Sequence, residues 1–437
     1  MVFSLTPLLT EKDDILSSEG GIDPLGLYQI ADALAGELVP GVRERQKHPR
    51  FLTAIAVSLA ICAEFEDDIV ASDGVSEPWQ IFEWYLVEGL VRKFPVDKSE
   101  RLGLPGSDKA VRAISDRVPL SAKRYLKTPS VFGYHGVYRS LARKLRIEQS
   151  GQLGDLGLEL ISTWAQEQKI EGFIGTIGGA GQEIKRNLVK AVASGIESGG
   201  TCRKPGWAGW DFFSEYLRPY GAGKRENKIL RNAILGDDQG FRRETFECII
   251  ADKGLAAWEK NKSERQFHQV LRQRANDRLG KLLDAIDTYE TFARLCQDAF
   301  DDCLYLMTEK SSTTSLQELS NSVAVQKAAK EVPILFLKVL QQLEPFGQLS
   351  IHFRNTFEDL CDQLSTISWV ERLIQHHERI QDLKPPEGKN SWFELWDKGL
   401  IVRPLYRRDK GGRHDDTYVH GYRTHSLWSF AKDLQLI

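Results

Sequence analysis

The densest group of side chains able to perform acid–base or metal chemistry lies near the carboxyl end of the chain. His414, His420 and His425 surround Asp415 and Asp416, and imidazole and carboxylate groups exchange protons near neutral pH or bind metals. The segment is expected to form a hairpin followed by the start of a helix, in which alternate side chains point to opposite sides. The five groups are therefore not expected to converge, and we predict no catalytic residue and no metal site here.

A second pair, Arg43 and His48, has the R-x4-H spacing of HEPN-type ribonucleases, in which both side chains meet on the RNA phosphate. Glu44 stands beside the arginine and Pro49 follows the histidine, which interrupts the helix that the motif needs. Neither a GxSxG elbow nor an HExxH helix occurs in the sequence. The sequence favours a protein without its own catalysis or cofactor, and a HEPN-like or metal-dependent nuclease stays open as an alternative.

Positive charge is concentrated in one stretch. Arg117 to Ile147 contains eight Lys/Arg and no Asp/Glu, although the chain has a formal net charge of −3. Within this stretch an apolar series recurs every four residues and an arginine series falls on another side of the same helix: Val137, Leu141 and Leu145, and Arg139, Arg143 and Arg146. The spacing predicts an amphipathic helix with a cationic face, which suits a polyanionic partner.

The residues that follow this helix predict a second module. Arg146-Ile147-Glu148 can leave the helix as a short strand, Gln149-Ser150-Gly151 can turn, and another helix follows to about Gln168. This order resembles the winged helix-turn-helix family over about Ala110 to Gln168. The resemblance implies that the cationic helix lies in the major groove of DNA, with its arginines near base edges or phosphates. A solvated or protein-contacting face explains the same charges, so both interpretations stay open.

The carboxyl-terminal segment is the other candidate surface. Its apolar and aromatic residues flank Gly411-Gly412 and predict a β-hairpin within about 400–425. This basic ribbon can lie on a nucleic-acid backbone or dock another subunit. From the two surfaces we predict nucleic-acid contacts at Lys123, Arg124, Lys127, Arg139, Arg143, Lys144, Arg146, Arg403, Arg407, Arg408, Arg413 and Arg423.

Basic and aromatic residues also alternate between Arg203 and Arg243, where Trp207 and Trp210 begin an aromatic run. Such a mixture can stack nucleobases. Because the aromatic residues recur near helical spacing, we favour a packed core for them.

Helices are expected to position these surfaces. Phe51 to about Phe65 is apolar almost all round, which predicts the central helix of an amino-terminal bundle. Further helices are predicted at two long segments within Gly254–Thr308, at Val323–Leu343, at Phe353–Ile380 and over the short sequence WFELWDKG.

Length and composition set the class of the protein. The 437 residues, 41% of them hydrophobic, are enough for two to four domains. We predict a mainly α, multi-lobed helical protein with a winged-helix-like module and a C-terminal β-hairpin. The predicted regions are an N-terminal helical bundle at 1–105, a basic winged-helix-like module at 106–171, a central helical region at 172–310 and a C-terminal helical region with the hairpin at 311–437.

The cellular setting is predicted from what the sequence lacks. The six cysteines are widely spaced without a CxxC pair, which suggests reduced thiols. The amino terminus has no signal-peptide pattern, and no apolar run is long enough to cross a bilayer. We therefore expect a cytoplasmic protein with no membrane partner.

Three blocks of sequence resemble large uncharacterised bacterial proteins of mobile-element and anti-phage defence islands: LGLYQIADALAGELVPGVRERQKHPRFLTAIAVSLAIC, YETFARLCQDAF and RPLYRRD with YVHGYR. The resemblance implies a defence-system component and no catalytic motif. We expect a non-catalytic nucleic-acid-binding subunit, with DNA as the favoured ligand and other proteins as partners. An assembly scaffold that does not contact nucleic acid is the alternative.

Overall fold

Apolar residues spaced three and four apart along the sequence become the buried faces of helices. The computed structural model describes residues 23–66, 68–95, 103–175, 178–202, 204–236, 240–310, 312–384, 388–396, 399–409 and 417–437. Helices dominate this part of the chain, and its strands form two antiparallel sheets of two strands each. The predicted mainly α class is confirmed.

The chain divides into two compact units, each assembled from two separate stretches. Unit 1 combines the residues up to Glu37 with Ala257–Tyr422, and unit 2 combines Leu38–Ala256 with Arg423–Ile437. The division at 1–105, 106–171, 172–310 and 311–437 follows the chain instead and stays a prediction about smaller modules.

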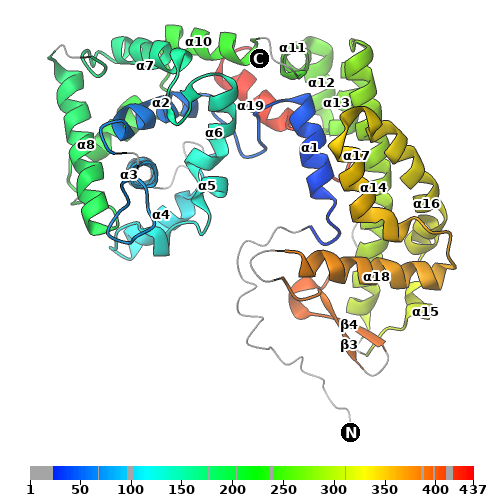
Figure 1. Cartoon of the computed structure of the whole chain (residues 1–437). Coiled ribbons are helices and arrows are strands. Elements are labelled where there is room, and N and C mark those ends of the chain that lie inside the picture. The colour runs from blue at the N-terminus through cyan, green and yellow to red at the C-terminus, as the bar shows by residue number, and fades with distance from the viewer. Residues whose placement is uncertain are drawn as a thin grey trace. The chain divides into compact units, whose positions relative to one another are not determined.

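The described residues of unit 2 form helices and one short hairpin. Its elements are α2 (Phe51–Cys62), α3 (Pro78–Lys93), α4 (Ser107–Ser115), η2 (Ala122–Arg124), α5 (Pro129–Phe132), α6 (Tyr134–Lys144), β1 (Glu148–Gln149), β2 (Gln152–Leu153), α7 (Asp155–Glu167), α8 (Ala180–Ser198), α9 (Gly209–Tyr216), α10 (Lys224–Ile234), α11 (Arg242–Ile250) and α19 (Thr424–Asp433). Figure 1 shows α2 and α3 inside this unit with α4 to α8 around them. Every residue of α2 from Phe51 to Ile61 is buried, which confirms that α2 is a central helix.

Unit 1 is organised around one long helix. Its elements are α13 (Glu264–Arg272), α14 (Asp277–Glu309), α15 (Leu316–Leu319), α16 (Val323–Leu343), η3 (Glu344–Phe346), α17 (Gln348–Phe357), η4 (Glu358–Leu360), α18 (Thr366–Asp382), β3 (Phe393–Trp396), β4 (Gly399–Val402) and η5 (Pro404–Tyr406). Two of the three boundaries between the units fall within α1 (Tyr28–Leu38) and α12 (Asp252–Asn261), and the third lies between Tyr422 and Arg423. The 33-residue α14 packs on α16, and Phe292 of α14 contacts Phe353 and Phe357 of α17.

Two predicted long helices are broken in the structure. The predicted first helix after Gly254 is divided into α12, α13 and the start of α14, because Ser263 and Asn276 cap new helices by accepting bonds from the backbone N–H of Gln266 and Leu279. The predicted Phe353–Ile380 helix likewise ends in α17, and Ser365 caps α18. Each cap ends the preceding run by giving the backbone another hydrogen-bond partner.

The C-terminal β-hairpin exists at a different place from the one predicted. Strand β3 lies in WFELWDKG, where we predicted a helix, and β3 pairs with β4 from Phe393↔Val402 to Trp396↔Gly399. The backbone of Leu400 also exchanges two hydrogen bonds with Thr314, so the outer edge of β4 is partly covered. The predicted turn at Gly411-Gly412 lies outside the described residues.

Two global features complete the description. None of the helices in the described part of the chain is long and apolar enough to cross a membrane. All six cysteines are free thiols, and those at positions 248, 296 and 303 are buried.

Candidate nucleic-acid interface

The basic stretch forms α6 and the hairpin that follows it. Val137, Leu141 and Leu145 are all buried, so the apolar face predicted for this helix is confirmed. After α6, β1 pairs with β2 in the register Glu148↔Leu153. Ser150 and Gly151 form the two-residue turn, with φ values of +51° and +84°. Positive φ at both residues is typical of two-residue hairpin turns. The order helix, hairpin and helix is therefore present, whereas membership of the winged-helix family stays a prediction.

A buried carboxylate offsets part of the cationic face of α6. Both oxygens of Glu148 accept bonds from Arg139 Nε, at 2.8 and 2.9 Å, and Arg143 Nε donates to Oε1 at 3.1 Å. The Glu148 side chain is fully buried, whereas those of Arg139 and Arg143 are 34% and 57% exposed. Burial by itself would raise the pKa of Glu148, but the two arginines outweigh it and hold this pKa below its ordinary value.

The basic stretch ends at Ile147, so its pattern does not predict the role of Glu148, the next residue. The available signal was its position as the first acidic residue after eight cations. With Glu148 included, two of the three arginines assigned to the cationic face share one internal counter-charge.

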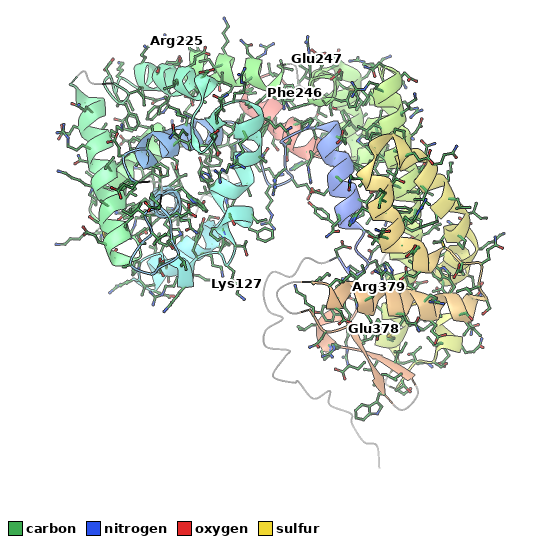
Figure 2. The ribbon with its side chains drawn as sticks, in the orientation of Figure 1. Lys127, Arg225, Phe246, Glu247, Glu378 and Arg379 are labelled. Carbon is green, nitrogen blue, oxygen red and sulfur yellow. The ribbon has the colours of Figure 1, made fainter. Side chains whose placement is uncertain are left out.

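The other predicted cations of this region are exposed and fall into two groups. We define the loop cluster as Lys123, Arg124 and Lys127, and the helix-end cluster as Arg143, Lys144 and Arg146; all six are exposed. Figure 2 shows Lys127 at the margin of unit 2. The loop cluster precedes α5 and the helix-end cluster lies at the carboxyl end of α6, so residues 134–142 of α6 lie between them, about 14 Å of helix.

Glu83 of α3 fixes the amino end of α6. Its carboxylate accepts bonds from the backbone N–H groups of Tyr134 and His135, both at 2.9 Å, and from the Tyr125 hydroxyl at 2.6 Å. Gly133 permits this approach, because an added Cβ would lie 2.3 Å from Glu83 Oε1. Burial raises the pKa of Glu83 to about 7, although the three hydrogen bonds act in the opposite direction.

Two of the predicted arginines of unit 1, Arg403 and Arg408, make contacts within that unit. Arg403 pairs with Glu394 at 3.1 Å, and Arg408 lies 4.0 Å from Asp301 and over the ring of Trp392. Arg407 is exposed. Arg413 lies outside the described residues.

Arg423, in unit 2, requires a correction. Its side chain is only 4% exposed, and its guanidinium pairs with Glu44 at 3.1 Å. Arg423 therefore stabilises the packing of the carboxyl-terminal segment and does not present a surface charge, contrary to the prediction.

The segment Thr417–Tyr422, predicted as the second arm of the hairpin, is a strap on α14 that forms no strand. Glu290 accepts bonds from the backbone N–H of Val419 at 2.6 Å and from the Tyr422 hydroxyl at 2.8 Å. Arg294 donates to the carbonyl of Tyr418 at 2.8 Å. The polar groups expected on a nucleic-acid-facing ribbon are thus used inside unit 1.

The histidines also have internal partners. His48 is buried with Nδ1 2.5 Å from Asp433, whereas Arg43 is exposed, and residues 41–50 contain no helix on which the R-x4-H pair could meet. His420 Nδ1 lies 2.8 Å from Glu290, and His425 stacks on Trp428. His414, Asp415 and Asp416 lie outside the described residues.

No group of three or more His, Cys, Asp or Glu side chains suited to a metal ion occurs within the part of the chain that the structure describes. Comparison with protein-family models, curated proteins and solved structures finds no match to this chain. Its function must therefore be inferred from its own side chains, and the exposed cations around α6 are the starting point.

Proposed function

We propose that unit 2 binds nucleic acid through the loop cluster and the helix-end cluster, as a non-catalytic subunit of a larger assembly. One observation carries the proposal: seven of the eight Lys/Arg in Arg117–Ile147 are exposed, in a stretch without acidic residues. Charges of this kind attract phosphates irrespective of base sequence. Duplex DNA is the favoured ligand, because the segment around α6 resembles a winged helix. The resemblance to defence-island proteins implies a bacterial anti-phage system in the cytoplasm as the setting.

The correction at Glu148 changes which residues should bind. Arg139 and Arg143 already satisfy a buried carboxylate, so their release to phosphate would leave that carboxylate without partners. The side chains of the loop cluster do not bond to Glu148. We therefore assign the larger share of phosphate contact to Lys123, Arg124 and Lys127.

Fluorescence anisotropy with labelled duplex DNA over a salt series tests this assignment. The variant is Lys123→Gln with Arg124→Gln and Lys127→Gln. Its matched control is Lys327→Gln with Lys330→Gln and Lys338→Gln, at three exposed lysines of α16 in unit 1. Since each phosphate contact contributes about 0.9 to the slope of log affinity against log salt, the variant should lower the slope by about 2 to 3. Absence of binding at low salt, or an equal loss in the control, contradicts the proposal.

Protein assembly is the second candidate, and the exposed apolar side chains of the β3–β4 region favour it. Leu395 is 77%, Trp396 50% and Leu405 63% exposed, and large exposed apolar side chains favour contact with another protein. Mass photometry of the purified chain and of pull-down complexes should show larger species that Leu395→Ser with Trp396→Ser abolishes. The control Ile334→Ser with Leu337→Ser, on equally exposed residues of α16, should leave these species intact. Loss of the larger species in both variants would reject the hairpin as the contact.

A further inference from the structure

A cavity of about 480 Å³ opens in unit 2, away from the residues assigned to phosphate contact above. The end of α3 supplies Arg92 and Lys93, α4 supplies Val111 and Ile114, and the other wall comes from the segment that includes Trp207 and Trp210. Its volume lies in the range of small-molecule sites, which are mostly apolar with a few placed polar groups.

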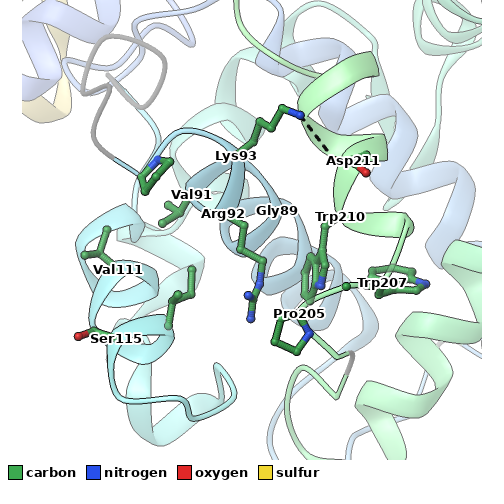
Figure 3. Close-up of a pocket in the computed structure, with 13 residues that line it drawn as sticks. Gly89, Val91, Arg92, Lys93, Val111, Ser115, Pro205, Trp207, Trp210 and Asp211 are labelled. Atoms are coloured by element: carbon green, nitrogen blue, oxygen red, sulfur yellow. Dashed lines mark ion pairs between the residues drawn. The ribbon is translucent and has the colours of Figure 1, made fainter.

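Arg92 is held in one orientation at the centre of this cavity. Its Nε and Nη2 donate to Glu88 Oε1 at 2.9 and 2.6 Å, and its Cζ lies 4.9 Å from the centre of the Trp210 ring. Glu88 is itself buried and accepts a bond from the Thr201 hydroxyl at 2.7 Å. Figure 3 shows the guanidinium pointing between α4 on one side and Trp210 with Pro205 on the other.

This orientation places the guanidinium between the apolar wall of α4 and the ring of Trp210 (Figure 3). Glu88 occupies the edge formed by Nε and Nη2. A guanidinium plane fixed in this way is a stacking platform for another planar group. Val111 and Ile114 form the other side of the slot that such a group would enter.

A second cation stands at the rim. Lys93 Nζ lies 3.9 Å from Asp211, and the two side chains are 54% and 58% exposed. An ion pair that is this long and this exposed contributes little. Lys93 can therefore turn to a ligand anion at small cost.

We infer that this cavity binds a planar ring carrying an anionic group, the chemistry of a nucleotide base and its phosphate. The ring lies between the guanidinium of Arg92 and the α4 wall, which extends the stack that begins at Trp210. The anionic group lies near Arg92 Nη1 and Lys93. Glu88 already pairs with the Nε–Nη2 edge of Arg92. The anionic group is therefore directed to Nη1 and to Lys93, whose ion pair with Asp211 is long and exposed.

Ligand-observed saturation-transfer NMR and calorimetry on the full chain test the inference, with AMP and TMP as probes. We expect both nucleotides to bind, and their nucleosides and inorganic phosphate to bind about tenfold or more weakly, since each provides only one of the two interactions. A 5′-phosphorylated oligothymidylate distinguishes the sources: preference for it assigns the site to a strand end, and preference for the mononucleotides assigns it to a free ligand. The inference is overturned if neither the nucleotides nor the oligonucleotide binds.

Two variants and a control locate the binding. Val111→Trp should fill the slot and abolish binding, and Arg92→Lys should weaken it about tenfold because the charge remains and the planar face is lost. Arg112→Trp, at the exposed neighbouring position on α4, should bind as wild type. Equal binding by the Val111→Trp variant and wild type, with both folded by circular dichroism, would place the ligand elsewhere. The loop-cluster variant should keep mononucleotide binding, so the two proposals can fail separately.

Discussion

Glu148 determines how much of the charge on α6 is available to a partner. Its buried carboxylate bonds to Arg139 and Arg143, while the arginines remain partly exposed. Removing the carboxylate should therefore cost stability and release positive charge at the same position. Both effects can be measured in one variant.

We expect Glu148→Gln to lower the free energy of unfolding by about 1 to 3 kcal/mol near neutral pH, as for other hydrogen bonds to charged groups. The arginines lower the pKa of Glu148 in the folded state. Its contribution is therefore complete above the ordinary carboxyl pKa and is lost as pH falls through the lowered value, so the difference between variant and wild type should shrink in acid. Urea unfolding measures this difference.

The matched control is Glu159→Gln, which removes the same charge from an exposed position of α7. Both variants should bind DNA somewhat more tightly than wild type through the added net positive charge. Equal stability of the two variants would contradict the structural role assigned to Glu148.

Single residues show where sequence interpretation succeeds and where it fails. Val137, Leu141 and Leu145 were recognised as an apolar face because helical spacing is local. The burial of Arg423 against Glu44 was not recognised, because the partner lies 379 positions earlier in the chain and no local pattern encodes it. Counting cations along a sequence therefore overestimates the charge on a surface.

At the scale of elements, the junction of α3 with α6 should respond to pH. Burial raises the pKa of Glu83 to about 7, well above its value in an unfolded chain. A group shifted in this direction contributes stability that is present in acid, below the unfolded pKa, and lost as pH rises through the folded value.

The corresponding test compares wild type with Glu83→Gln between about pH 5 and pH 8 by urea unfolding. Over this range wild type should lose up to about 3 kcal/mol relative to the variant, the equivalent of a shift of about 2.5 pKa units. The variant keeps one oxygen, which can accept the bonds that Tyr134 and Tyr125 donate to Oε1, and loses the acceptor for the N–H of His135, a loss that does not vary with pH. A difference that does not change with pH would show that Glu83 is ionised throughout.

Element boundaries were predicted best where one helix carries its own signals. The predicted helix Val323–Leu343 is α16, and Ser322 caps it by accepting a bond from the backbone N–H of Val325. Phe393–Trp396 was predicted as a helix and is a strand, because of contacts with residues elsewhere in the chain. The backbone of Thr314 bonds to β4, and the side chains of Phe393 and Val402 are buried. Short apolar segments fit either structure, and their long-range partners decide between the two.

At the scale of the whole molecule, the chain passes between the two units three times. The last passage gives α19 to unit 2, where it packs on α11, and Asp433 and Ser426 bond to His48 and to the carbonyl of Arg43. Contacts across nearly the full length of the chain leave no trace in local periodicity. The predicted sequential regions therefore could not anticipate that the final helix completes a unit begun at Leu38.

If each unit has its own core, removing a buried side chain of α19 should leave a cavity that destabilises unit 2 selectively. Phe430 is fully buried, and Phe→Ala substitutions in cores cost about 3 to 5 kcal/mol. In Phe430→Ala, hydrogen exchange measured by mass spectrometry should accelerate in peptides of α2 and α11, while α14 and α16 keep wild-type protection. Phe357→Ala, equally buried in unit 1, should give the reverse pattern. Equal acceleration of hydrogen exchange in both units, in either variant, would mean that the two units unfold as one cooperative structure. The loop cluster in unit 2 and its control on α16 in unit 1 would then no longer be independent sites.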